Sequence, residues 1–263
     1  MVDQTVLYDD EGGVALVTLN RPDRRNAFNA AMHAELNACL DRAAGDDGIR
    51  AVLLTGNGGA FSIGHDLDDE AMGNPPEPPD FGKLPERYYN PLLRRIRQLE
   101  MPVICAVNGI AAGAAVSVAL ACDLVFAARS ASFVQPFAGL GLMPDAGATW
   151  FLPRLVGLQR AMGLALLGES LAAEQAAEWG LIWKVVEDGR LLEVAFVLAR
   201  ELAHGPTRAF ATTKKAIHCA PGNTLDQQLD VEKYLQRALA RSADHAEGIV
   251  ARRTGRKAVF RGV

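Results

Sequence analysis

The chain has 263 residues, a length that suits one large domain or one domain with an appendage. Apolar residues make up 49% of it and charged residues 22%, and these shares exclude the disordered and fibrous classes of protein. The formal net charge of −4 provides no overall attraction to nucleic acid, so we expect no nucleic-acid partner.

The sequence also predicts no membrane partner and a cytoplasmic location. The uncharged stretch at 103–122 contains an asparagine, a serine and glycines, and it is too rich in alanine for a membrane span. Residues 1–10 include acidic residues and lack the basic and apolar regions of a signal peptide. The four cysteines lie far apart without CxxC spacing, which favours reduced thiols over a disulfide framework or a zinc site.

Strand and helix patterns alternate along the first half of the chain. Short apolar runs rich in β-branched residues predict strands, and apolar residues at helical spacing predict helices. In chain order we expect a strand at 14–19, a helix at 26–43, a strand at 51–55, a helix at 88–99, a strand at 103–107, a helix at 111–121 and short strands at 124–127 and 132–135. From residue 145 the sequence is mostly helical, with strand character only at 182–186. This order predicts an α/β core at 1–200 followed by a helical region at 201–263.

The motifs of several common enzyme classes are missing from the sequence. The glycine cluster at 56–59 follows a strand, but Phe61 stands where a dinucleotide fingerprint needs glycine. There is no GxxxxGK(S/T) motif for phosphate binding and no GxSxG motif for a nucleophilic serine. The five histidines form no HxxxH pair, so we expect no metal ion.

Two turns with small residues each follow a predicted strand. They are FSIGHDL at 61–67 and VNGIAAGAA at 107–115, which runs into an alanine-rich helix. Small residues at such a turn let a ligand approach the backbone and leave N–H groups free. One N–H group from each turn could therefore converge on a single oxygen as an oxyanion hole. The alternative is that the small residues only permit tight packing of the helix.

Further motif segments follow one another along most of the chain. They are NRP at 20–22 with NAF at 26–28, FSIGHDL at 61–67, PVICAVNG at 102–109 with Gly113, DLV at 123–125, GLGLMPD at 139–145, LPRLVG at 152–157, and AEQA at 173–176 with GLI at 180–182. In order and spacing these segments resemble the enoyl-CoA hydratase/isomerase (crotonase) superfamily. The resemblance implies a crotonase-like α/β fold with a ββα superhelix (spiral) core and a C-terminal helical trimerisation region. It also implies an acyl-CoA thioester substrate and a homotrimer or a hexamer built as a dimer of trimers.

By motif position, the resemblance implies that the backbone N–H groups of Ile63 and Ala114 hold the thioester carbonyl. Family members often have glycine at the second position, so the methyl group of Ala114 is a mild departure. The residues implied in binding the CoA part of the substrate are Arg24, Arg25, Ile63, Gly64, His65, Asp66, Leu67, Ala114 and Phe137. Arg24 and Arg25 could also be ordinary loop charges, and the position of His65 favours the rim of the site over a role as catalytic base. No separate cofactor is expected, because CoA is part of the substrate.

The residues that distinguish members of this family favour a reaction other than hydration of the substrate. Hydratases that resemble this sequence carry glutamates at the positions of Ser117 and Phe137, and neither residue here can act as a base. Asp145 remains, at a position where some isomerase branches carry their acidic residue. A single carboxylate suits an isomerisation, because it can take a proton from a carbon that the thioester activates and return it further along the chain. The alternative is that Asp145 caps the helix after it.

Other segments resemble one branch of the family in particular. QPFAGLGLMPD at 135–145, TWFLPR at 149–154, LALLGE at 164–169 and EWGLIW at 178–183 are similar to the phenylacetate-degradation isomerases that act on 2-(1,2-epoxy-1,2-dihydrophenyl)acetyl-CoA. Ala148 and Ile63 depart from that branch, which usually has glycine and alanine there. The sequence therefore predicts an acyl-CoA isomerase that uses Asp145 as a proton shuttle. The alternatives are an enoyl-CoA hydratase of fatty acid β-oxidation and a non-catalytic acyl-CoA-binding homologue.

Overall fold

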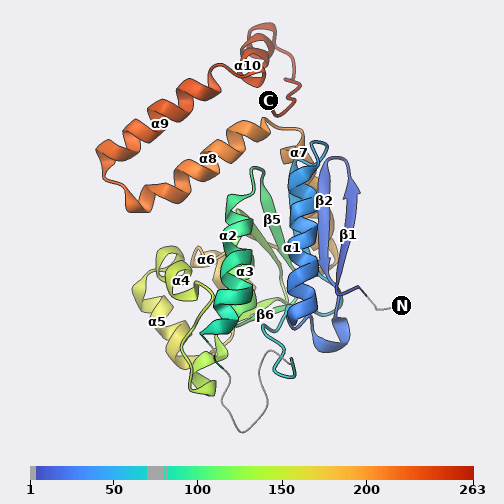
Figure 1. The fold of residues 1–263 in the computed structure, drawn as a ribbon, viewed down its shortest axis with the longest axis vertical. Coiled ribbons are helices and arrows are strands. Elements are labelled where there is room, and N and C mark those ends of the chain that lie inside the picture. Colours follow the sequence, from blue (N-terminus) through green and yellow to red (C-terminus); the bar gives the residue numbers. More distant parts are fainter. Residues whose placement is uncertain (1–3, 70–79, 81) are drawn as a thin grey trace.

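The computed structural model describes residues 4–69, 80 and 82–263, and a six-stranded sheet forms the centre of this part of the chain (Figure 1). Its strands lie in the order β1 (Val6–Glu11), β2 (Val14–Leu19), β3 (Ala51–Gly56), β5 (Val103–Val107), β7 (Leu124–Ala128) and β10 (Lys184–Val186). β1 and β2 pair as an antiparallel hairpin, and the remaining pairs are parallel. Because β3 and β5 are buried on both faces, they consist of almost uninterrupted apolar residues.

A second, smaller sheet stands at the end of the first, where the parallel strands leave it. It contains the short strands β4 (Ala60–Ser62), β6 (Ile110–Ala112), β8 (Ser132–Val134) and β9 (Leu171–Ala172). β4, β6 and β8 each follow a strand of the main sheet after only a few residues, and a helix comes next along the chain. This repeat of two strands and a helix confirms the expected ββα architecture.

Helices cover the sheets and continue beyond them. Their bounds are α1 (Ala30–Gly45), α2 (Asn90–Gln98), α3 (Ala114–Ala121), α4 (Ala148–Val156), α5 (Leu158–Leu167), α6 (Ala173–Glu178), α7 (Leu191–Ala203), α8 (Thr207–Cys219), α9 (Leu225–Leu239) and α10 (Ala243–Thr254). α3 is buried on all sides, so it needs no polar face and consists of alanine, valine, leucine and one serine. α7 packs against β2, β3, β5 and β7. Each helix in the described residues is too short or too polar to span a membrane.

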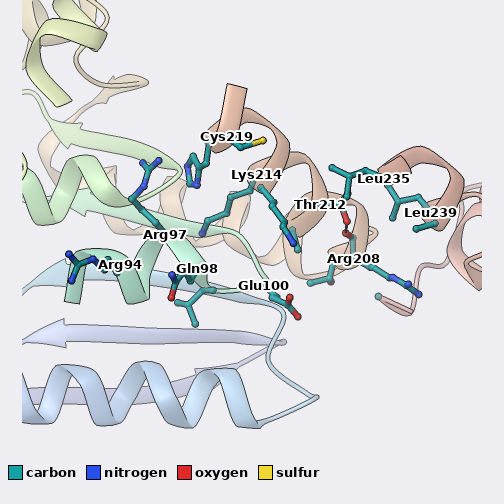
Figure 2. A pocket seen from close by; sticks show the side chains of 17 residues that line it. Arg94, Arg97, Gln98, Glu100, Arg208, Thr212, Lys214, Cys219, Leu235 and Leu239 are labelled. Atoms are coloured by element: carbon teal, nitrogen blue, oxygen red, sulfur yellow. Dashed lines mark hydrogen bonds between the residues drawn. The ribbon is translucent and has the colours of Figure 1, made fainter. Parts of the chain in front are cut away.

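α8, α9 and α10 extend away from the core (Figure 1). A buried lysine joins α8 to it: Lys214 Nζ lies 2.9 Å from Asp123 Oδ2 and donates to the carbonyl oxygen of Ile96 at 3.0 Å. A cleft of about 990 Å³ separates α8 and α9 from the end of α2, and Figure 2 shows its basic lining. The predicted division at residue 200 falls within α7, and a separate C-terminal domain stays a prediction.

The structure corrects several predicted boundaries. The helix expected at 111–121 begins only at Ala114, because residues 110–112 pair with 132–134 as strands and Gly113 has a φ of 57° that ends the pairing. The helix expected at 26–43 begins at Ala30, because the side chain of Asn29 accepts the N–H of Met32 at 2.9 Å. The prediction of a single strand after residue 145 was wrong, since β9 also lies there.

Candidate active site

In the first glycine turn, the N–H group that is free to bind a ligand is not the predicted one. The N–H of Ile63 donates to the carbonyl oxygen of Arg25 at 3.2 Å, so it is not free to bind a ligand. The carbonyl of Gly64 accepts the N–H of Phe28 at 2.7 Å. Because C=O and N–H of one trans peptide point in opposite directions, the N–H of His65 points away from Phe28. No acceptor within the described residues contacts it, and His65 therefore replaces Ile63 as the candidate donor.

The second glycine turn lies directly against the first. Ala114 is the first residue of α3, where a helix leaves its N–H groups without partners inside the helix. A Cβ atom on Gly64 would lie 2.9 Å from the carbonyl oxygen of Ala112 and 3.8 Å from the nitrogen of Ala114. The ring of Phe137 lies on the other side, next to Gly113. The structure thus brings together the free N–H groups of His65 and Ala114, which can share one ligand oxygen.

A buried polar network holds the first turn in place. Nη1 of Arg21 lies 2.8 Å from Oδ2 of Asp66 and also donates to the carbonyl oxygen of Ala27 at 2.6 Å. Asn26 is fully buried, and its amide donates to the carbonyl oxygens of Asn57 and Ala60. These contacts tie the loop after β2 to the segment that carries His65. The side chain of Asp66 therefore faces Arg21, and only its backbone can border a ligand.

The predicted CoA-binding side chains differ in their surroundings. Arg24 pairs with Asp68 at 2.9 Å on the surface, whereas Arg25 is exposed and its backbone is left-handed, with a φ of 48°. Leu67 is 62% exposed, next to the turn. These three side chains lie on the two segments that flank the free N–H of His65. Their position is compatible with the predicted CoA contacts, which stay a prediction.

Asp145 lies on a strained turn before α4. Ala146 has a φ of 48° and Gly147 a φ of 79°, and the N-terminal cap of α4 is Gly147 without a side-chain hydrogen bond. Asp145 therefore does not cap the helix. Its Oδ1 atom is buried and has no hydrogen-bond partner among the described residues. A half-buried carboxylate without a partner is costly for stability, and such groups concentrate at functional sites.

The pKa of Asp145 gives the site a testable pH dependence. Burial raises the pKa of its carboxyl group above the ordinary value. A carboxylate that removes a proton must be ionised, so kcat/KM should fall as the pH drops through this raised pKa. We expect the acid limb of the profile at a higher pH than the value of about 3.9 for an exposed aspartate. Rates measured between about pH 4 and pH 8 test this; a flat profile down to the acid end would contradict it.

Sequence reasoning missed an aromatic cluster beside the first turn. Tyr89 is buried at the end of a π-helical turn, Pro85–Tyr89, and its hydroxyl lies 3.3 Å from Nδ1 of His65. The ring of His33 packs edge-on against Tyr89, with a centroid distance of 4.6 Å, and stacks on Tyr88 at 5.0 Å. Asp145 is among the charges that raise the pKa of Tyr89, after burial itself. Tyr89 is thus within electrostatic reach of the carboxylate. The only sequence signal was the pair of tyrosines at the start of a predicted helix.

His33 makes the stability of the fold sensitive to acid. Both of its ring nitrogens are buried without partners in the described part of the chain, and burial, followed by the charge of His65, lowers its pKa to about 3. The folded protein keeps His33 neutral, whereas the unfolded chain takes up a proton below pH 6.5. Between pH 7 and pH 5 this residue alone should cost about 2 kcal/mol of unfolding free energy. Urea unfolding of the wild type and of His33→Phe should show that the variant loses less; equal losses would contradict the assignment.

Two further polar side chains near the second turn lack partners. The hydroxyl of Ser117, on α3, and both amide atoms of Gln135 are buried, and the described residues offer none of them a hydrogen bond. Phe137 follows Gln135 in the short helical turn Pro136–Leu140. Buried polar groups are normally satisfied, so unpaired groups around one place indicate a polar ligand or ordered water.

Comparisons with known proteins agree with this arrangement. The family described as "Enoyl-CoA hydratase/isomerase" matches residues 9–262. The chain is 53% identical to 1,2-epoxyphenylacetyl-CoA isomerase from Escherichia coli and 33% identical to trans-2-decenoyl-(acyl-carrier-protein) isomerase from Streptococcus mutans, over 98% of both chains in each case. The crystal structure of an enoyl-CoA hydratase from Bacillus anthracis superposes with a TM-score of 0.91 at 32% identity, covering 99% of this chain and 100% of that one. The resemblance seen in the sequence is confirmed, and this chain belongs to the enoyl-CoA hydratase/isomerase family.

Proposed function

We propose that this chain is an acyl-CoA isomerase that acts on an epoxide of a phenylacetyl thioester. The observation that carries the proposal is Asp145, a half-buried carboxylate whose Oδ1 atom has no partner in the described residues and whose charge acts on Tyr89, the neighbour of His65. Identity of 53% with a 1,2-epoxyphenylacetyl-CoA isomerase supports the choice of substrate. No cofactor takes part, because CoA enters as a part of the substrate.

The reaction needs one base and one place for negative charge. Asp145 removes a proton from the acyl carbon next to the thioester, and the electron pair moves onto the thioester oxygen as an enolate. The N–H groups of His65 and Ala114 donate to that oxygen, and each such donor is worth roughly 3 kcal/mol in the transition state. The bond between the two epoxide carbons breaks, so that the ring widens to an oxepin that keeps the oxygen, and the protonated Asp145 returns its proton to a ring carbon at the far end of the conjugated system. Substrate and product have the same atoms, as an isomerisation requires.

The side chains around Asp145 favour isomerisation over hydration. Hydration needs a water molecule that is held and activated, commonly by two carboxylates, whereas Ser117 and Phe137 occupy the places expected for them. The ring of Phe137 is apolar, and the hydroxyl of Ser117 is a weak base. Asp145 alone can move a proton within one substrate molecule, but it cannot also orient water.

The test is turnover by the full chain on two substrates. With 1,2-epoxyphenylacetyl-CoA we expect a product of unchanged mass and altered retention in chromatography. With crotonyl-CoA we expect little loss of the conjugated absorbance, which hydration would remove. Rapid hydration without isomerisation would contradict the proposal, and saturable binding without any turnover would indicate a non-catalytic homologue.

Helices α8, α9 and α10 form an arm that extends from the core, and its exposed apolar side chains support assembly into trimers or into hexamers. Ile217, Leu225 and Leu229 are 65%, 74% and 52% exposed, on α8 and α9, which extend beyond the core. Apolar side chains of this number on one arm are usual at contacts between subunits. Light scattering of the purified protein should give a mass of three or six chains, and a monomer would contradict this part of the proposal.

A further inference from the structure

Tyr89 is the only described side chain that contacts the imidazole of His65 through a hydrogen bond. Its hydroxyl lies 3.3 Å from Nδ1, and its ring is fixed by Phe28 and His33, at centroid distances of 5.9 and 4.6 Å. Tyr89 is 2% exposed, so water does not compete for the hydroxyl group. The contact joins the start of α2 to the turn that carries the free N–H of His65.

The pattern of unpaired atoms fixes the direction of this hydrogen bond. Nε2 of His65 is buried and has no partner among the residues described. If Tyr89 donates to Nδ1, only the proton on Nε2 is left without an acceptor. If Nδ1 donates instead, both Nε2 and the hydroxyl hydrogen of Tyr89 are left without partners. Since each unpaired buried group is costly, Tyr89 donates and His65 carries its proton on Nε2.

The Tyr89 contact adds to the backbone hydrogen bonds that hold the turn at Gly64 and His65. Gly64 has a φ of 90°, a conformation that glycine adopts without strain. On one side the Gly64 carbonyl holds the peptide to Phe28, and on the other the N–H of Asp66 donates to the Phe28 carbonyl at 2.8 Å. Tyr89 adds a third point of attachment, through the side chain of the same residue that carries the candidate donor.

We propose that Tyr89 is a positioning residue for the thioester: by donating to Nδ1 of His65, it fixes the peptide N–H that receives the carbonyl oxygen. The inference rests on the proposed function for its meaning in catalysis. Tyr89 itself touches neither the thioester nor the migrating proton. Its effect is to hold the N–H of His65 in the orientation that meets the carbonyl oxygen. A small displacement of such a donor costs much of its contribution to stabilising the transition state.

The experiment compares Tyr89→Phe with a matched control, Tyr88→Phe. Tyr88 is the neighbouring tyrosine, it also stacks on His33, and its hydroxyl makes no hydrogen bond within the described residues. We expect Tyr89→Phe to lower kcat about tenfold with KM changed by less than about twofold, because the variant loses the orientation of the donor and not the affinity for the substrate. Tyr88→Phe should keep the rate of the wild type. A wild-type kcat in Tyr89→Phe would overturn the proposal.

Substitutions of His65 show whether the effect passes through Nδ1. Asparagine places its Oδ1 atom where Nδ1 of histidine stands, so His65→Asn should retain about fivefold more activity than His65→Ala. The double variant with Tyr89→Phe and His65→Ala should be no slower than His65→Ala alone, because each substitution removes the same hydrogen bond between the two side chains. Losses that multiply in the double variant would show that Tyr89 acts elsewhere.

A spectroscopic readout separates this inference from the proposed reaction. Hydrogen bonds to a thioester carbonyl lower its stretching frequency, and infrared spectra of bound phenylacetyl-CoA labelled at the carbonyl carbon report this without turnover. The shift should be smaller in Tyr89→Phe than in the wild type and in Tyr88→Phe. If the wild type fails to isomerise the epoxide but the shift still depends on Tyr89, the proposed reaction is wrong and the positioning role stands. An unchanged shift in Tyr89→Phe refutes the positioning role, whatever the activity.

Discussion

Asp145→Asn should lower the rate of isomerisation about 10³-fold or more, which is the range that loss of a general base costs. Asparagine has nearly the shape of aspartate but cannot take up the proton. Acyl-CoA binding should stay close to that of the wild type, because the thioester contacts are made by backbone N–H groups. Thermal stability should not fall, since the change removes a half-buried carboxylate whose Oδ1 atom has no partner in the described structure.

The measurement is single-turnover kinetics together with calorimetric binding of an unreactive acyl-CoA. Asp47→Asn is a matched control, because Asp47 is exposed in the turn before β3, whereas the first glycine turn follows the opposite end of that strand. The control should retain full activity. An Asp145→Asn protein with the turnover of the wild type would show that another group moves the proton.

Ala114→Pro should lower kcat/KM about 10²- to 10³-fold, the usual cost of removing one oxyanion donor. Ala114 is the first residue of α3, a position at which proline is accepted because the lost N–H has no partner within the helix. Gly113, with a φ of 57°, lies outside the helical region and accommodates the following ring. The substitution thus deletes the candidate donor and places a ring carbon where the oxygen would bind.

Ala243→Pro is the matched control for this backbone change. Ala243 is the first residue of α10, it is exposed, and the residue before it, Ser242, has extended backbone. The control should fold and turn over substrate like the wild type. Circular dichroism checks that Ala114→Pro is folded, and full activity in that folded variant would remove Ala114 from the oxyanion hole.

The parts of the fold that could be read from the sequence are those with a long, uniform signal. The strands at 14–19 and 103–107 occur with the predicted bounds, because continuous apolar runs of this length are typical of buried strands. β4, β6, β8 and β9 have two or three residues each, too few for any periodic pattern. Of these, only β8 was predicted, because it begins a separate run after a loop.

The candidate site shows the same division between local and distant information. Asp145 and Ala114 could be placed from motifs, since the chemistry depends on their own atoms. The choice between Ile63 and His65 could not, because it depends on the carbonyl of Arg25, which comes from another loop with left-handed backbone. Tyr89 was likewise invisible, since its role follows from a contact with a residue 24 positions away.

A crystal structure of Asp145→Asn with 1,2-epoxyphenylacetyl-CoA would show the oxyanion hole and the base together. We expect the thioester oxygen to lie about 2.7–3.1 Å from the backbone nitrogens of both His65 and Ala114. We also expect the amide of residue 145 to lie within about 3.5 Å of the acyl carbon that loses its proton. A thioester oxygen bound elsewhere, or a residue 145 turned toward solvent and away from the acyl group, would contradict the proposed mechanism.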